Sequence, residues 1–147
     1  MNFLFVLFAL AFQAPQAAPP PPCTPGGTQY VCGQQAPEDL VLVPGSGWIV
    51  ASVFAGNGGI RLVNIRDKAT TVAYPAATAK DQFDKKTYDS CPGPPDAAEK
   101  AKFRTHGLAL RAGRNSVHTL YAVHHGNRES IEVFDLDARA KPPATRR

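Results

Sequence analysis

Residues 38–75 read EDLVLVPGSGWIVASVFAGNGGIRLVNIRDKATTVAYP, and this stretch decides the fold class of the 147-residue chain. Its apolar residues recur with period two in short runs rich in Val, Ile and Leu, which is typical of β-strands. The runs are separated by PGSG, AGNGG and RDKA, whose Gly, Pro, Asn and Asp residues favour tight turns. We therefore predict four consecutive strands, over residues 38–44, 47–54, 59–65 and 70–75.

Residues 76–104 interrupt this pattern with many charged side chains and the turn cluster CPGPPD. A loop of that length in a compact domain is either functional or disordered, and the sequence DAAEKAKF within it allows one helical turn. Strands are predicted again over residues 106–111, 117–125 and 130–137. The remaining residues, 138–147, show no strand pattern and are predicted to form a disordered basic tail.

Four strands followed by three more, in groups of about 35 to 40 residues, is the spacing of β-propeller blades. Residues 38–137 are therefore predicted to form the first two blades of an all-β propeller, with the second blade lacking its fourth strand. A closed propeller needs at least four blades, so the chain is expected to be a truncated, partial propeller. A small seven-stranded β-sandwich is the alternative architecture.

The first 37 residues contain no charged side chain. Residues 1–18 combine an apolar core with small residues suited to cleavage, which predicts a secretory signal peptide. That core is too short to remain in a bilayer as a spanning helix, so no transmembrane span is expected. Residues 19–37 are predicted to be an extended linker rich in Pro and Gly. The protein is accordingly expected to be secreted or periplasmic.

The three cysteines are informative because disulfides persist in exported proteins. Cys23 and Cys32 are candidates for a disulfide that closes a short loop, and Cys91 is then left over. If the chain is never exported, all three are instead free thiols. No zinc-binding pattern is present in their spacing.

The formal net charge of +4 at pH 7 says little about partners. Several basic residues crowd the last nine positions, and the other basic side chains are interleaved with acidic ones. A nucleic-acid interface needs a clustered basic face with groove-reading or aromatic elements. We therefore expect no nucleic-acid partner.

Glu38 and Asp39 lie together at the start of the first predicted strand. Adjacent side chains of a regular strand point to opposite faces, so these two carboxylates should not share one ligand. Carboxylates at one end of a sheet suit hard cations such as Ca²⁺, which take oxygen ligands from several segments. The alternative is an acidic strand terminus that simply faces water.

The four histidines of the chain all lie between residues 104 and 136. His106 begins a strand directly after the long loop and precedes Gly107, which lets backbone or ligand approach closely. His124 and His125 end the next strand and face opposite ways, so only one of them can point at a shared centre. His118 is expected at the other end of that strand, in a structural role.

Three segments together resemble the paraoxonase family of calcium-dependent lactonases and arylesterases, and more distantly the gluconolactonase-like propellers. They are PEDLVLVPGSGWIVASVF, THGLAL and LYAVHHGNRESIEVFDLD, in the same order as in the family. The resemblance covers about Glu38 to Asp137, the N-terminal portion of such a protein, and implies a six-bladed propeller.

The resemblance also implies roles for five residues. Glu38 would ligate a catalytic Ca²⁺, and Asp39 together with the Leu108 carbonyl would ligate a structural Ca²⁺. His106 would be the base that deprotonates water, with His125 as its relay partner. Since a histidine has an unperturbed pKa near 6.5, a neutral base is available at neutral pH. The family's remaining calcium ligands come from later blades.

The sequence therefore predicts a calcium-dependent hydrolase of lactones or aryl esters, present as a truncated and inactive N-terminal fragment. Its partners would be a small lactone or ester substrate, which the sequence does not identify further. The alternative is a non-enzymatic secreted β-module that uses its long loop for protein contact. A third hypothesis is that open sheet edges lead the partial propeller to self-associate.

Overall fold

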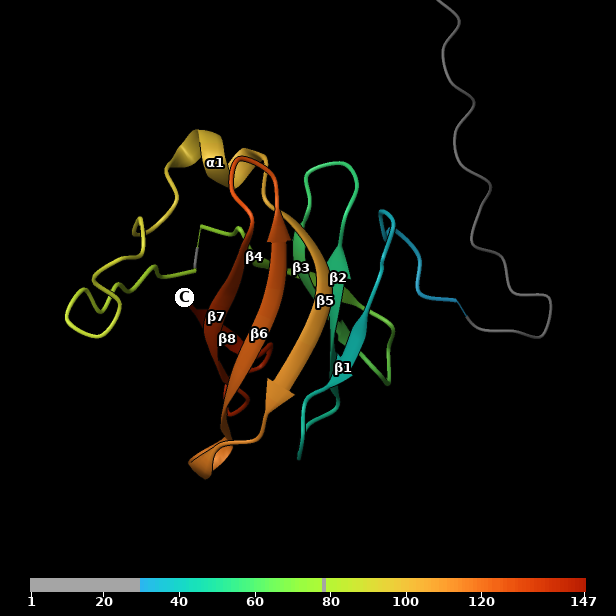
Figure 1. The fold of residues 1–147 in the computed structure, drawn as a ribbon. Helices are drawn as coiled ribbons and strands as arrows, with labels where there is room; N and C mark the ends of the chain where they lie inside the picture. Colours follow the sequence, from blue (N-terminus) through green and yellow to red (C-terminus); the bar gives the residue numbers. More distant parts are fainter. Residues whose placement is uncertain (1–29, 78) are drawn as a thin grey trace, which may run out of the picture.

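The structure is a computed structural model that describes residues 30–77 and 79–147. The chain forms two four-stranded antiparallel sheets, each with its strands in sequence order (Figure 1). The first sheet consists of β1 (Leu40–Leu42), β2 (Trp48–Val53), β3 (Gly59–Asn64) and β4 (Thr70–Tyr74). The second consists of β5 (Arg104–Arg111), β6 (Val117–His125), β7 (Ser130–Asp137) and β8 (Ala144–Arg146). The all-β prediction is confirmed.

The predicted strands correspond closely to the observed ones. Each of the four predicted strands of the first group contains one strand of the first sheet, although β1 is only three residues long. In the second group β6 and β7 have the predicted bounds, and β5 begins two residues earlier than predicted. The predicted signal peptide, most of the predicted linker and Cys23 lie outside the described residues, so their assignments stay predictions.

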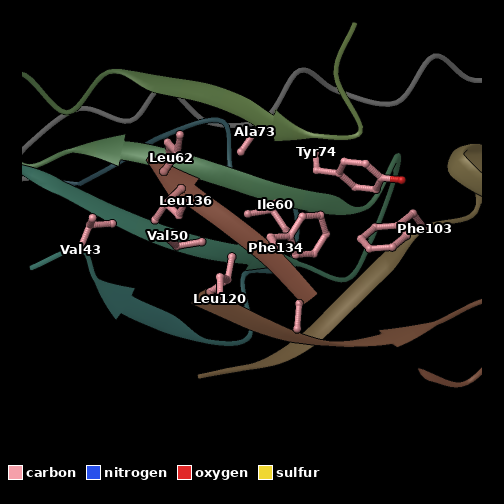
Figure 2. Close-up of a cluster of buried hydrophobic side chains, with 11 residues drawn as sticks. Val43, Val50, Ile60, Leu62, Ala73, Tyr74, Phe103, Leu120, Phe134 and Leu136 are labelled. Carbon is pink, nitrogen blue, oxygen red and sulfur yellow. The ribbon is translucent and has the colours of Figure 1, made fainter. Parts of the chain in front are cut away.

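A single apolar core lies between the two sheets (Figure 2). Tyr74 at the end of β4 packs edge-on against Phe103 and Phe134, with ring centroids 4.8 and 5.1 Å apart. Leu62 of β3 and Leu120 of β6 are also fully buried in this cluster. Because both sheets bury their apolar side chains against each other, neither is independent of the other.

The predicted disordered tail over residues 138–147 is wrong. Ala144–Arg146 forms β8, which pairs with β7 and completes the second sheet. The Thr145 hydroxyl donates a 2.8 Å hydrogen bond to the carbonyl of Ala73 in the other sheet. Three residues are too few to show an alternating apolar pattern, so β8 is specified by these long-range contacts and not by its own sequence.

The described part of the long connection between the sheets contains one short α-helix. α1 (Ala97–Ala101) starts with a capping box in which Asp96 and Glu99 each accept a hydrogen bond from the other's backbone N–H, which satisfies two otherwise free amides. It is the predicted helical turn, and it delivers Phe103 to the core. Cys91 in this connection is an exposed free thiol.

Gly58 shows how tightly the β2–β3 turn fits against the chain that enters β5. Its φ is +48°, and a Cβ at this position would lie 1.7 Å from the carbonyl oxygen of Phe103. Only glycine combines this backbone conformation with such an approach. The turn is therefore held next to the start of the second sheet.

Across the described residues, no helix is long and apolar enough to span a membrane.

Candidate functional site

Five side chains meet where β1, β2, β5 and β6 end or begin, and we call them the rim cluster: Glu38, Phe54, His106, His125 and Glu129. The Nε2 atom of His106 lies 3.6 Å from Oε2 of Glu38. The rings of His106 and His125 meet edge-on with centroids 5.8 Å apart, and the Phe54 ring contacts both of them at 5.7 and 6.0 Å. The structure thus brings together three of the predicted site residues.

Contacts between the sheets position the rim cluster. The Thr105 hydroxyl of β5 is fully buried and accepts a 3.0 Å hydrogen bond from the backbone N–H of Val53 in β2. Phe54 and His106 each follow one residue later and therefore lie side by side. Figure 1 shows β5 running next to β2 at the junction of the two sheets.

A β-bulge in β5 aims the His106 side chain. Thr105 pairs with His124, and Leu108 pairs with Ala122, so His106 and Gly107 together oppose the single residue Val123. In a regular strand Thr105 and Leu108 would face opposite sides. The extra residue lets both face the core and turns His106 outward, with 54% of its side chain exposed. Bulges of this kind commonly re-aim a side chain near a functional site.

Glu129 is a member of the site that the sequence analysis missed. Its carboxylate is hydrogen-bonded to Nδ1 of His125 across the β6–β7 turn. A carboxylate at this position favours the tautomer with the proton on Nδ1, which leaves Nε2 of His125 free to accept a proton. His125 and Glu129 are four residues apart, on either side of a short hairpin turn. This spacing is the sequence signal from which their contact could have been predicted.

Asp39 makes a separate connection between the sheets. Its carboxylate accepts hydrogen bonds from the backbone N–H of Leu108, at 2.7 Å, and of Leu40, at 2.8 Å. Glu38 approaches His106 instead, so the two neighbouring carboxylates do serve different partners. Asp39 and Leu108, predicted to share one ion, lie together, although here Leu108 presents its amide and not its carbonyl to Asp39.

The other two histidines are buried. His124 is 3% exposed and stacks on Phe103 with ring centroids 4.2 Å apart. Burial lowers the pKa of His124, partly offset by its hydrogen bond to the carbonyl of Arg104. His118 is 4% exposed and accepts a hydrogen bond from the backbone N–H of Gly113 at 3.3 Å. Both face the core, so His125 is the member of its pair that reaches the rim.

The described residues do not by themselves fit a resident Ca²⁺. Among them no group of three or more His, Cys, Asp and Glu side chains is arranged to hold a metal ion. Ca²⁺ takes about six to eight oxygen ligands, whereas Glu38 and Asp39 supply two carboxylates. Both oxygens of Asp39 already accept backbone hydrogen bonds.

Comparisons of the chain with models of protein families, with curated proteins and with solved structures found no match. The resemblance to the paraoxonase family therefore rests on the quoted motifs alone.

Proposed function

We propose that this chain carries two blades of a paraoxonase-like β-propeller that hydrolyses lactones or aryl esters. The observation that supports the proposal is the rim cluster, in which Glu38, His106 and His125 lie together at the surface. Histidines in such a partly exposed cluster are accessible to substrate and water. General bases are recognised first by this kind of geometry.

His106 would act as the general base. Its Nε2 accepts a proton from a water molecule while the water oxygen forms a bond to the ester carbonyl carbon. The Glu38 carboxylate, 3.6 Å away, would stabilise the imidazolium that results. When the tetrahedral intermediate collapses, the bond from carbon to the leaving oxygen breaks, and the imidazolium returns its proton to that oxygen.

His125 would serve as the relay partner. Its ring contacts that of His106 edge-on, and the Glu129 carboxylate orients it through Nδ1. A base that is itself oriented by a third group is a recurring arrangement in hydrolases. Phe54, packed against both rings, would hold them in place and limit the access of bulk water from one side.

Calcium is part of this proposal only as a ligand to be tested. Glu38 and Asp39 would contribute carboxylates to it, but the water activation described above uses protein groups alone. Because these two carboxylates supply few of the oxygens that a Ca²⁺ site needs, isothermal titration of the chain with CaCl₂ should give weak binding at most, and Glu38→Gln should weaken it further. Heat signals that are identical in the wild type and in Glu38→Gln would remove calcium from the proposal.

The activity is tested with phenyl acetate and an aliphatic δ-lactone. In contrast to the inactive fragment that the sequence predicts, the assembled rim cluster leads us to expect turnover by the wild type. The loss in His106→Gln should be about 10²-fold or more, which is the usual contribution of a general base. Arg111→Gln is the matched control because Arg111 is an exposed residue of the same strand. Equal rates in His106→Gln and the control, or no turnover by a folded wild type, would contradict the proposal.

A second candidate is a non-enzymatic module for protein contact. It is favoured by exposed apolar side chains on β7, where Ile131 is 66% and Val133 is 41% exposed. They pair across the sheet with Val123 and Tyr121 and share one face with them. If this candidate is correct, Ile131→Ser reduces concentration-dependent association, including self-association, in sedimentation velocity. His106→Gln leaves that association unchanged.

A further inference from the structure

A pocket of about 470 Å³ lies between the first sheet and α1. Arg61 of β3 and Val72 of β4 line it from the sheet, and Lys100 lines it from the helix. Arg61 and Val72 pair across the two strands. They face away from the core, because the neighbours of Arg61 in β3, Ile60 and Leu62, belong to the core cluster and successive side chains of a strand alternate. The volume is within the usual range of small-molecule sites, and none of the described lining residues belongs to the rim cluster.

Arg61 carries a positive charge that the described part of the chain does not neutralise. Its side chain is half-buried, and its neighbours across the sheet are the apolar residues Ala51 and Val72. Among the described residues, none forms an ion pair or a side-chain hydrogen bond with the Arg61 guanidinium. Charged groups that lose part of their hydration are normally paired, because desolvation without a partner costs free energy. The guanidinium is thus available to an anion that enters the pocket.

Lys100 differs from Arg61 because its charge is already paired. Its Nζ atom lies 2.5 Å from a carboxylate oxygen of Asp81. The described lining contains no Asp or Glu, so the pocket offers one unpaired positive charge and no negative one. That balance suits an anion with a single charge, such as a carboxylate, whose two oxygens match the planar fork of a guanidinium. Inorganic phosphate carries more than one negative charge at neutral pH and would leave part of it unbalanced.

The remaining described lining is mostly apolar. Val72 is 41% exposed, and Pro75, Ala97 and Ala101 also line the pocket. Covering such side chains with a hydrocarbon chain removes apolar surface from water, which is favourable. The pocket therefore suits a ligand that combines one carboxylate with an apolar chain.

We propose that this pocket binds a small aliphatic monocarboxylate. The carboxylate would accept hydrogen bonds from the Arg61 guanidinium, and the hydrocarbon chain would lie against Val72 and Ala101. The side-chain amide of Asn57, which also lines the pocket, supplies a further N–H donor for the same carboxylate. The site goes beyond the proposed hydrolase function and does not depend on it, because the two sites share no described residue.

The pocket is tested by titrating the ¹⁵N-labelled 147-residue chain and following the backbone amide shifts of Arg61 and Val72. The probe is hexanoate, compared with hexan-1-ol, hexylamine, acetate and inorganic phosphate. We expect hexanoate to bind about tenfold or more tightly than hexan-1-ol, the equivalent of one hydrogen bond to a charged group, and more tightly than acetate, which lacks the chain. Equal affinities for hexanoate and hexan-1-ol, a preference for hexylamine or phosphate, or no saturable shifts with hexanoate would overturn the assignment.

Two arginines of the first sheet provide the matched variants. Arg61→Met should abolish the preference for hexanoate over hexan-1-ol, because it removes the charge and keeps an unbranched side chain. Arg66→Met should retain the preference, since Arg66 is exposed in the β3–β4 turn and does not line the pocket. Equal losses in the two variants would show that the overall positive charge of the protein, and not Arg61, attracts the carboxylate.

A third variant separates this pocket from the rim cluster. His106→Gln should leave the affinity for hexanoate unchanged, whatever its effect on ester hydrolysis. A loss of affinity in His106→Gln as large as that in Arg61→Met would place the bound carboxylate at the rim cluster and refute the pocket assignment.

Discussion

The molecule contains two clusters of acidic and basic side chains that differ in burial. The rim cluster is partly exposed, with His106 at 54% and His125 at 37%. The second cluster, which we call the closed cluster, consists of Tyr74, Asp81, Lys100, Glu132 and Arg147. Its two central side chains are nearly buried, Glu132 at 6% and Arg147 at 11%. Residue types alone therefore do not separate a partly exposed cluster from a buried one.

The charges of the closed cluster are paired with one another. Arg147 donates to one carboxylate oxygen of Glu132, Oε2, from Nε at 2.6 Å and from Nη2 at 2.5 Å, and hydrogen bonds between two ionised groups are stronger than neutral ones. Asp81 accepts from Lys100 at 2.5 Å and from the Tyr74 hydroxyl at 3.3 Å. These groups come from β4, the long connection, β7 and the end of the chain. The closed cluster therefore holds the two sheets and their connection together.

Arg147→Met should produce the largest loss of stability. It removes the Arg147 partner of the buried Glu132 carboxylate, while Arg128 at 3.4 Å and the Ser130 hydroxyl at 2.7 Å still contact the other oxygen of Glu132. Breaking a buried pair costs about 3–5 kcal/mol, so we expect the lower end of that range, about 3 kcal/mol. The free energy of unfolding, measured with urea, should fall by that amount. Arg146→Met is the control, because Arg146 is an exposed neighbour in β8. Similar losses of unfolding free energy in both variants would show that the buried pair of Arg147 and Glu132 stabilises the fold no more than the exposed Arg146 does.

Asp39→Ala should have the next largest effect. Asp39 is the carboxylate that ties β1 to β5 by accepting the N–H of Leu108. Its removal leaves a partly buried amide without an acceptor, which costs about 1–3 kcal/mol. Glu38→Ala, in the adjacent exposed position, should change the unfolding free energy by less than about 0.5 kcal/mol. The pair of variants separates the structural carboxylate from the one assigned to the site.

The strands, and much of the rim cluster, were predictable from the sequence. Short runs rich in Val and Ile between turn residues, such as GWIVASVF, indicate strands from the local sequence, and the opposite directions of Glu38 and Asp39 follow from strand geometry. The assignment of His106 and His125 came from the resemblance to a family, and the structure brings the two rings together. It also selects His125 over His124, because His124 faces the core.

The remaining features depend on contacts between distant residues. The β5 bulge shifts the register by one position at His106 and Gly107, and no local pattern in the sequence reports such a shift. β8 depends on pairing with β7 and on the buried Thr145. Sequence periodicity contains none of this information.

The pH dependence of stability should reveal the lowered pKa of the buried His124. Burial lowers the pKa of His124, and the nearby Arg128 and Arg147 act in the same direction, while Glu132 opposes them. Below about pH 6.5 the unfolded chain therefore binds this proton more readily than the folded one. Stability is present above that pH and falls as the pH drops toward the lowered pKa. Urea midpoints at pH 7.5 and 5.5 should differ less in His124→Gln than in the wild type or in His106→Gln, which keeps His124. An equal difference in all three proteins would contradict this origin.

Glu129→Ala should have the smallest effect on stability, and it tests the difference between the two clusters most directly. Like Arg147→Met, it removes one partner of an acid–base pair, but the Glu129 side chain is 71% exposed. Exposed pairs contribute about 0–1 kcal/mol, so the urea midpoint should stay nearly unchanged. The ¹⁵N shifts of the His125 ring should nevertheless change, because Nδ1 loses the carboxylate that favours its protonated tautomer. A loss of stability as large as that of Arg147→Met would make the rim cluster a structural element and would refute its proposed chemical role.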